Sequence, residues 1–157
     1  MSLLNNLQQL CIEKGVSIAV AESCTAGLIA SKLTALPGSS SFFKGGVVAY
    51  QNEIKTKILE VSQSIIDEKT EVCAEVVRQM AKSVLEKFDT DFAIATSGYA
   101  GPTGGTNKNP IGTVFIAIAS KFDVAVSRFI FLGDRQSIVN QASEIALDLL
   151  YTEIKKQ

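Results

Sequence analysis

Short, almost wholly apolar runs alternate with longer amphipathic segments along most of this chain. Residues 16–21, 46–50 and 92–96 form three such runs. They indicate strands that are covered on both faces, because such strands lack the apolar–polar alternation of a half-exposed strand. The segments between them place apolar residues at helical spacing. This pattern predicts an α/β domain with helices on both faces of a sheet.

The amphipathic segments predict helices over residues 3–14, 26–33, 52–59, 77–88 and 138–150. Gly15 is placed to end the first of these helices, and Asn52 is a natural N-cap for the third. Two β-rich runs, 112–119 and 124–131, are separated by a few residues and predict an antiparallel hairpin. We therefore expect a single domain over residues 1–157, a three-layer α/β/α sandwich around a mixed sheet of roughly five strands.

The charge balance argues against nucleic acid as a partner. Fifteen basic and sixteen acidic residues leave a net charge of -1, so no general positive field draws the chain to phosphate backbones. No apolar run approaches the roughly 20 residues that cross a bilayer, and the start of the chain does not resemble a secretion signal. We expect a cytoplasmic protein without membrane contact, and a homodimer, as is common for α/β enzymes of this size.

The chain has no histidine and only three cysteines, Cys11, Cys24 and Cys73, which are widely spaced. This composition predicts neither a metal site nor a disulfide framework. It also removes the usual general base of serine and cysteine hydrolases. Any base must then be Lys, Tyr, Asp or Glu, and no cofactor is predicted.

The segment Glu22–Gly27 lies where an apolar strand ends and a helix is expected to begin, which is where α/β proteins tend to bind ligands. Ser23 there is either a nucleophile or the N-cap of that helix. Cys24 is a rival nucleophile, because a thiol at a helix N-terminus can have a lowered pKa. The alternative for Cys24 is a small buried packing residue.

The segment Tyr50–Lys55 runs from a strand end into a helix and can face the same end of the sheet as Ser23. A desolvated lysine loses proton affinity and can act as a base toward a serine hydroxyl, with a tyrosine hydroxyl to relay a proton or orient the pair. The alternative is a lysine in solvent on a short helix.

Two further segments are suited to ligand binding. Thr96–Thr106 is a Gly-rich loop whose backbone N–H groups can approach a ligand closely, although it matches neither a P-loop nor a dinucleotide fingerprint. Its alternative is a structural turn. Phe131–Arg135 precedes the last helix, and the Arg135 guanidinium either binds a phosphate or carboxylate or lies in solvent.

Taken in order, these segments resemble the carboxy-terminal domain family of the competence/damage-inducible protein CinA, which includes nicotinamide mononucleotide amidohydrolases of the PncC type. The resemblance rests on Glu22–Thr25, Pro37–Ser40, Gly45–Gly46, Tyr50 with Asn52 and Lys55, Ala100–Pro102 with Gly104–Gly105, Pro110 with Gly112–Val114, and Gly133–Arg135.

The resemblance implies deamidation of nicotinamide mononucleotide to the acid mononucleotide and ammonia, in pyridine-nucleotide salvage. The catalytic roles fall on Ser23 as nucleophile and on Lys55 and Tyr50 as assisting groups. The implied partner is a small-molecule nucleotide, with expected contacts at Thr25, Gly27, Gly46, Asn52, Ser97, Gly98, Gly101, Gly104, Gly105 and Arg135. Arg135 is the candidate for the substrate phosphate.

The sequence departs from the family pattern at several positions. Ala26 stands where a second Gly is common, and Asn109 and Val139 stand where Lys and Arg are frequent. The alternative function is an inactive nucleotide-binding domain of the same fold, or an interaction domain linked to competence or DNA damage.

Overall fold

The computed structural model describes residues 2–157. In chain order its elements are α1 (Leu3–Lys14), β1 (Ile18–Glu22), α2 (Leu28–Leu33), the short 3-10 helix η1 (Ser39–Ser41), β2 (Phe43–Val48), α3 (Asn52–Leu59), α4 (Gln63–Lys69), α5 (Ala74–Phe88), β3 (Phe92–Gly98), β4 (Thr113–Ser120), β5 (Val124–Ile130) and α6 (Arg135–Lys155).

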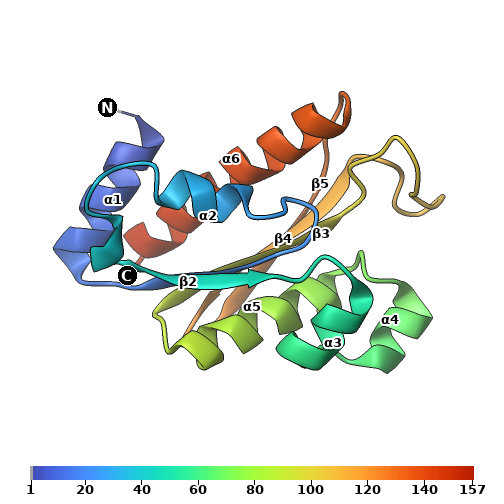
Figure 1. Cartoon of the computed structure of the whole chain (residues 1–157), viewed down its shortest axis with the longest axis horizontal. Coiled ribbons are helices and arrows are strands. Elements are labelled where there is room, and N and C mark those ends of the chain that lie inside the picture. Colours follow the sequence, from blue (N-terminus) through green and yellow to red (C-terminus); the bar gives the residue numbers. More distant parts are fainter. Residues whose placement is uncertain (1) are drawn as a thin grey trace.

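The five strands form one mixed sheet in the order β2-β1-β3-β4-β5. β1 runs parallel to both β2 and β3, whereas β3–β4 and β4–β5 are antiparallel. Helices α1, α2 and α6 cover one face of the sheet, and α3, α4 and α5 lie on the other (Figure 1). The predicted α/β fold with a mixed five-stranded sheet is confirmed.

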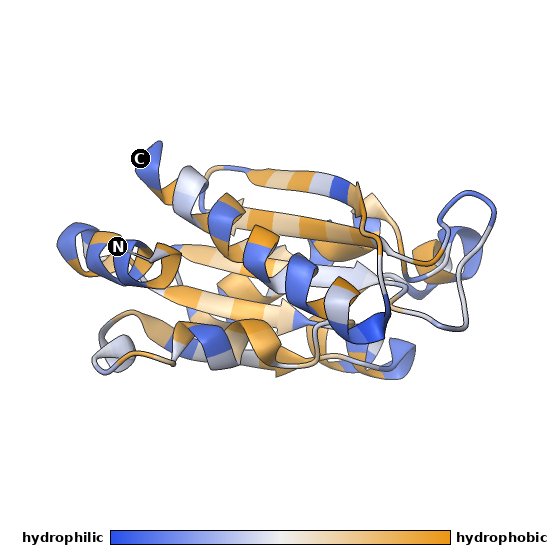
Figure 2. Ribbon diagram, turned by 90° about the horizontal axis from the view of Figure 1, so that it is seen from above, coloured by the Kyte–Doolittle hydropathy of each residue, from blue (hydrophilic) through white to orange (hydrophobic). Residues whose placement is uncertain are grey.

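Each face of the sheet has its own apolar core. On the first face, Leu7 of α1, Ile29 of α2 and Leu147 of α6 pack against side chains of the central strands. On the second face, Met80 and Val84 of α5 are fully buried. Figure 2 shows strands that are mostly hydrophobic and helices in which hydrophobic and hydrophilic residues alternate along the ribbon. Residues 2–157 contain no helix of the length and apolar character needed to span a bilayer.

The segment after β1 differs from the prediction. We expected the next helix to begin near Ser23, but α2 begins at Leu28. Ala26 (φ 49°) and Gly27 (φ 93°) adopt left-handed conformations, which an α-helix excludes. The buried Glu22 carboxylate instead accepts hydrogen bonds from the N–H groups at the start of α2, those of Ile29 (2.9 Å) and Ala30 (3.0 Å). Ser23 is therefore not the N-cap of this helix.

The observed ends of other strands and helices also differ from the predicted ones. The second strand begins at Phe43 and ends at Val48, before the predicted end at Tyr50. Gln51 is the N-cap of α3, and Asn52 is the first helical residue, so the predicted capping role of Asn52 is wrong. Helix α4 was not predicted, because seven residues are too few to show a helical period.

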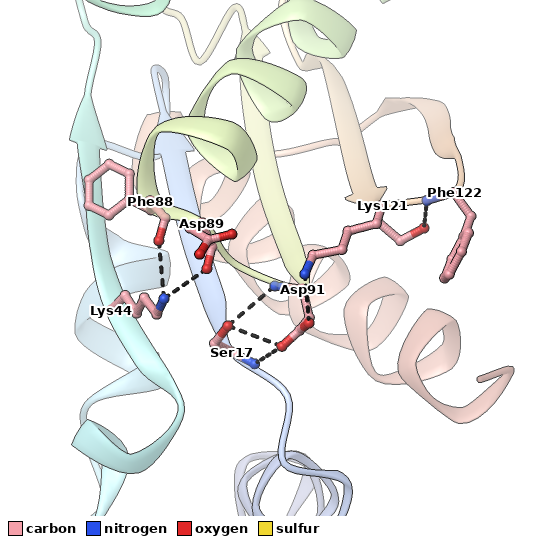
Figure 3. Close-up of polar contacts among 8 residues, drawn as sticks. Ser17, Lys44, Phe88, Asp89, Asp91, Lys121 and Phe122 are labelled. Carbon is pink, nitrogen blue, oxygen red and sulfur yellow. Dashed lines mark hydrogen bonds and ion pairs between the residues drawn. The ribbon is translucent and has the colours of Figure 1, made fainter.

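A polar cluster links the segments that precede β1 and β3 (Figure 3). Ser23 follows the opposite end of β1. The Asp91 carboxylate accepts hydrogen bonds from the Ser17 N–H (2.9 Å) and hydroxyl (3.1 Å), and it lies 3.6 Å from the Lys121 ammonium. Burial of this carboxyl raises its pKa. The contacts from Ser17 and Lys121 outweigh that effect, so the pKa of Asp91 lies below its usual value.

We predict that Asp91→Asn lowers the free energy of unfolding by about 1 kcal/mol at pH 7, a value discounted for the partial exposure of the carboxyl. A carboxyl with a lowered folded-state pKa stabilises the protein above its unfolded pKa of about 3.9, and this contribution is lost as pH falls through the folded pKa. Urea titrations at several pH values should show the two proteins converging below about pH 4. The exposed Asp148→Asn on α6 is the control, and an equal loss in both variants would contradict the account.

Candidate active site

The carboxyl ends of β1 and β3 bring Ser23 into a fixed position. These strands are parallel neighbours with Glu22 opposite Thr96, so the chain leaves both at the same edge of the sheet. The Ser23 N–H donates to the Thr96 carbonyl (3.2 Å), and the Thr25 and Thr96 hydroxyls are hydrogen-bonded at 2.9 Å. The turn that carries Ser23 is thus fastened to the neighbouring strand.

Ser23 lines a cleft of about 180 Å³ at this edge. Tyr50 comes to the cleft from the segment after β2, and Lys55 comes from α3. Glu71 approaches from the connection between α4 and α5. The Ser97 hydroxyl, also in the cleft, donates to the Glu71 carbonyl (2.8 Å) and so ties that connection to β3. Side chains from distant parts of the sequence therefore meet in one cavity.

The Lys55 ammonium lies inside the protein. The residue is only 1% exposed, and its Nζ donates to the Tyr50 carbonyl at 3.1 Å. Burial lowers the pKa of Lys55, and the negative charge of Glu71 partly offsets that effect. A lysine in this environment gives up its proton more readily than one in water, which a general base requires. The alternative of a solvated surface lysine is wrong.

Tyr50 and Arg135 form the outer wall of the cleft. Arg135 donates from one guanidinium nitrogen to the Tyr50 hydroxyl and from another to the Gly101 carbonyl, both at 2.6 Å. Neither partner is charged, and within residues 2–157 the guanidinium makes no ion pair with a carboxylate. Its positive charge is therefore free to bind an anionic group.

Cys24 differs from Ser23 in its surroundings. The Cys24 side chain belongs to the core on the α6 face of the sheet, and burial raises the pKa of its thiol to about 12. A thiol with such a pKa is almost wholly protonated at neutral pH and is a poor nucleophile. These observations favour a packing role for Cys24.

The structure brings together most of the predicted site residues, but not all. Besides Ser23, Tyr50 and Lys55, the cleft is lined by the predicted contact residues Asn52, Ser97, Gly98, Gly101 and Arg135. Five predicted contact residues lie outside it: Thr25, Gly27, Gly46, Gly104 and Gly105. Close packing explains why residue 46 is a glycine, because a Cβ at this position would lie 2.4 Å from the Val20 carbonyl oxygen in the neighbouring strand.

A second hollow of about 540 Å³ adjoins the cleft. The two cavities share Cys24, Tyr50 and Arg135, so the Arg135–Tyr50 hydrogen bond stands between them. Thr25 and Val139 line the second hollow. A ligand in the Ser23 cleft can extend past Arg135 into this space.

Asn109, one of the departures from the family pattern, lies at neither cavity. Its side chain is buried, donates to the Val72 carbonyl (3.2 Å) and accepts from the Arg128 Nε (3.1 Å), next to a different hollow. The departure at Asn109 therefore does not change the lining of the Ser23 cleft.

Sequence reasoning missed Glu71. No local pattern marks it, because its relation to Lys55 arises only when the connection between α4 and α5 folds over the end of β3. Within residues 2–157, no cluster of three or more His, Cys, Asp or Glu side chains has the arrangement of a metal site.

A model of the CinA C-terminal domain matches residues 1–154. This chain belongs to the CinA C-terminal domain family. It is 44% identical to a CinA-like protein of Desulfotalea psychrophila over 90% of this chain, and 45% identical to one of Shewanella denitrificans over 95% of it. The matched regions are 34% and 35% of those two proteins, so the chain spans about a third of the length of these relatives.

Solved structures of CinA superfamily proteins have the same fold. One from Klebsiella pneumoniae superposes with a TM-score of 0.95 at 32% identity, over 99% of this chain and 97% of that one. One from Escherichia coli superposes with a TM-score of 0.91 at 35% identity, over 96% and 88% of the two chains. Sequence similarity and structural similarity to these proteins both extend over nearly the whole chain.

Proposed function

We propose that this domain is a serine amidohydrolase that deamidates nicotinamide mononucleotide to nicotinate mononucleotide and ammonia, in pyridine-nucleotide salvage. The observation that carries the proposal is a buried lysine of lowered pKa in the same cleft as Ser23, in a chain without histidine. Serine with lysine as base is an established arrangement for acyl transfer.

The reaction proceeds in two steps. Neutral Lys55 accepts the Ser23 hydroxyl proton as Oγ attacks the carboxamide carbon, and the resulting ammonium then protonates the departing nitrogen, which leaves as ammonia. Water attacks the acyl-enzyme in the second step, with Lys55 again as the base, and releases the carboxylic acid. The Tyr50 carbonyl orients the lysine throughout through its hydrogen bond to Nζ.

The negative charge on the tetrahedral intermediate needs hydrogen-bond donors. The Ser23 N–H is committed to Thr96, and no helix opens at Ser23 to supply donors there. The candidates are the N–H groups of the next two residues, Cys24 and Thr25, in the tight turn before Gly27.

The substrate's charged end is assigned to Arg135. Its guanidinium has only neutral partners and stands between the Ser23 cleft and the second hollow. A nucleotide with its carboxamide at Ser23 can place its phosphate against this group.

Three variants test the nucleophile and the base through ammonia release from nicotinamide mononucleotide in a coupled assay. Ser23→Ala and Lys55→Met should each lower kcat about a thousandfold or more, because each removes a group that the covalent step requires. Cys24→Ala should keep most of the activity, since the Cys24 thiol is protonated. Circular dichroism and thermal unfolding establish that each variant is folded. Loss of activity in Cys24→Ala with retention in Ser23→Ala would move the nucleophile to the thiol.

The charge of Glu71 should appear in the pH dependence of kcat/KM. The base must be neutral, so activity rises with pH through the Lys55 pKa. The Glu71 carboxylate raises that pKa by stabilising the ammonium, and Glu71→Gln should therefore move the acidic limb of the profile to lower pH.

The matched control for Glu71 is Glu68→Gln, an exposed glutamate on α4 beside a different hollow. Its profile should coincide with that of the wild type. An acidic limb that stays in place or moves to higher pH in Glu71→Gln would contradict the assignment of Lys55 as the base.

A further inference from the structure

The strand at one edge of the sheet has a row of backbone groups that no neighbouring strand pairs with. β5 pairs with β4 and has no strand on its other side. The bonds Ser120 N–H to Asp123 carbonyl and Phe131 N–H to Gly112 carbonyl show that odd-numbered residues of β5 point their backbone groups toward β4. Because antiparallel pairing alternates, the even-numbered residues 124, 126, 128 and 130 point theirs outward.

Large apolar side chains lie beyond both ends of this edge. Phe122 is 87% exposed and Leu132 is 83% exposed. Phe122 precedes Ser127, the central residue of β5, by five positions, and Leu132 follows it by five. Isolated apolar side chains are ordinary on a surface, but two so exposed at equal spacing about a free strand form a symmetric pattern.

The segments that carry these two side chains are held in place. The turn before β5 is fixed by Lys121, which contacts Asp91, and by the Phe122 N–H, which donates to the Ser120 hydroxyl (3.2 Å), while the Phe122 ring extends away from these contacts (Figure 3). At the other end, the Leu132 carbonyl accepts from the Gln141 side chain (2.8 Å). These contacts fix the backbone at both positions.

We propose that β5 pairs antiparallel with β5 of a second copy of this chain, in the register that places Ser127 opposite the partner's Ser127. In this register, residue 124 lies opposite residue 130 of the partner subunit, and residue 126 lies opposite residue 128 of the partner subunit. The outward-pointing backbone N–H and carbonyl groups of the two strands therefore face each other. The four pairs exchange about eight hydrogen bonds. At about one bond per 100–200 Å² of interface, this number is in the range of a stable protein–protein interface.

The apolar pattern selects this register. Phe122 meets the partner's Leu132, and Leu132 meets the partner's Phe122. A shift that centres the pair on residue 126 places Phe122 opposite the partner's Ile130 and leaves Leu132 opposite the partner's Ser120. Sliding one strand past the other by a single residue would place even-numbered residues opposite odd-numbered ones. Outward-pointing backbone groups would then face groups that are already bonded to β4.

Two arginine side chains, Arg78 and Arg128, lie near this edge and affect whether a second strand can pair with it. At Val124, the carbonyl accepts from the exposed Arg78 (3.2 Å) and the N–H donates to the Asp123 carboxylate (2.8 Å). In the pairing, the partner's Ile130 N–H and carbonyl replace these two bonds. Arg128 is turned back onto its own chain, where it donates to the Lys108 carbonyl (2.9 Å) and lies over the Phe115 ring. Its charge is therefore directed away from the centre of the pairing.

Paired in this way, two copies join their sheets into one. The partner's Phe122 then packs against the segment at Leu132, three residues before Arg135 of the candidate active site. The proposal does not depend on the chemistry at that site, and its test measures association alone.

Single cysteine variants test the register. Residue 127 and the partner's residue 127 form a non-hydrogen-bonded pair, whose Cα atoms are about 4.5 Å apart and whose Cβ atoms can be joined by a disulfide. Ser127→Cys should form a covalent dimer on mild oxidation, as seen by non-reducing electrophoresis. Ala125→Cys, on the same strand and the same face of the sheet, lies four positions from its symmetry mate and should not. The native Cys11, Cys24 and Cys73 are buried and do not compete.

Sedimentation velocity over a range of concentrations tests the apolar contact. Phe122→Ser with Leu132→Ser should weaken dimerisation about tenfold or more, whereas Ile12→Ser, an exposed apolar position on α1, should not change it. A wild-type chain that is monomeric at all concentrations would overturn the proposal. So would equal cross-linking of Ser127→Cys and Ala125→Cys, or dimerisation that the Phe122 and Leu132 substitutions leave unchanged.

Discussion

The candidate active site depends on the burial of one ammonium group. Lys55 is almost fully enclosed, and its Nζ has a neutral partner in the Tyr50 carbonyl. A lysine in water holds its proton at neutral pH, and desolvation is what makes it available as a base. In the proposed reaction of a chain without histidine, this lysine takes the place of the imidazole that serine hydrolases commonly use. The fold encloses the lysine by bringing α3, the connection after α4 and the end of β3 around it.

The layers of the fold could be predicted from sequence because they follow from periodicity. The continuous apolar runs of β1 and β3 and the helical stripe of α5 each contain enough residues to show their period. The start of α2 could not be predicted in this way. It depends on left-handed backbone at Ala26 and on a cap supplied by the side chain of Glu22, seven residues before Ile29. Such a cap is visible only in three dimensions.

The same distinction applies to the site. Ser23, Tyr50 and Lys55 could be proposed from sequence because each follows a strand that ends at the same edge of the sheet. Glu71 could not, because its distance from Lys55 depends on how α4 packs. The glycines were the least predictable residues. Gly46 is required by close packing against Val20, and its sequence context does not distinguish that need from ligand binding.

The most direct test of the account is to identify the atom that carries the acyl intermediate. Nicotinamide mononucleotide is mixed with the protein, the mixture is quenched in acid within the time of the first expected turnover, and the protein is digested and analysed by mass spectrometry. If Ser23 is the nucleophile, the peptide that contains it gains the mass of the acyl group, and fragmentation assigns that mass to the serine oxygen. An acyl group on the Cys24 sulfur, or complete turnover without a covalent intermediate, would contradict the account.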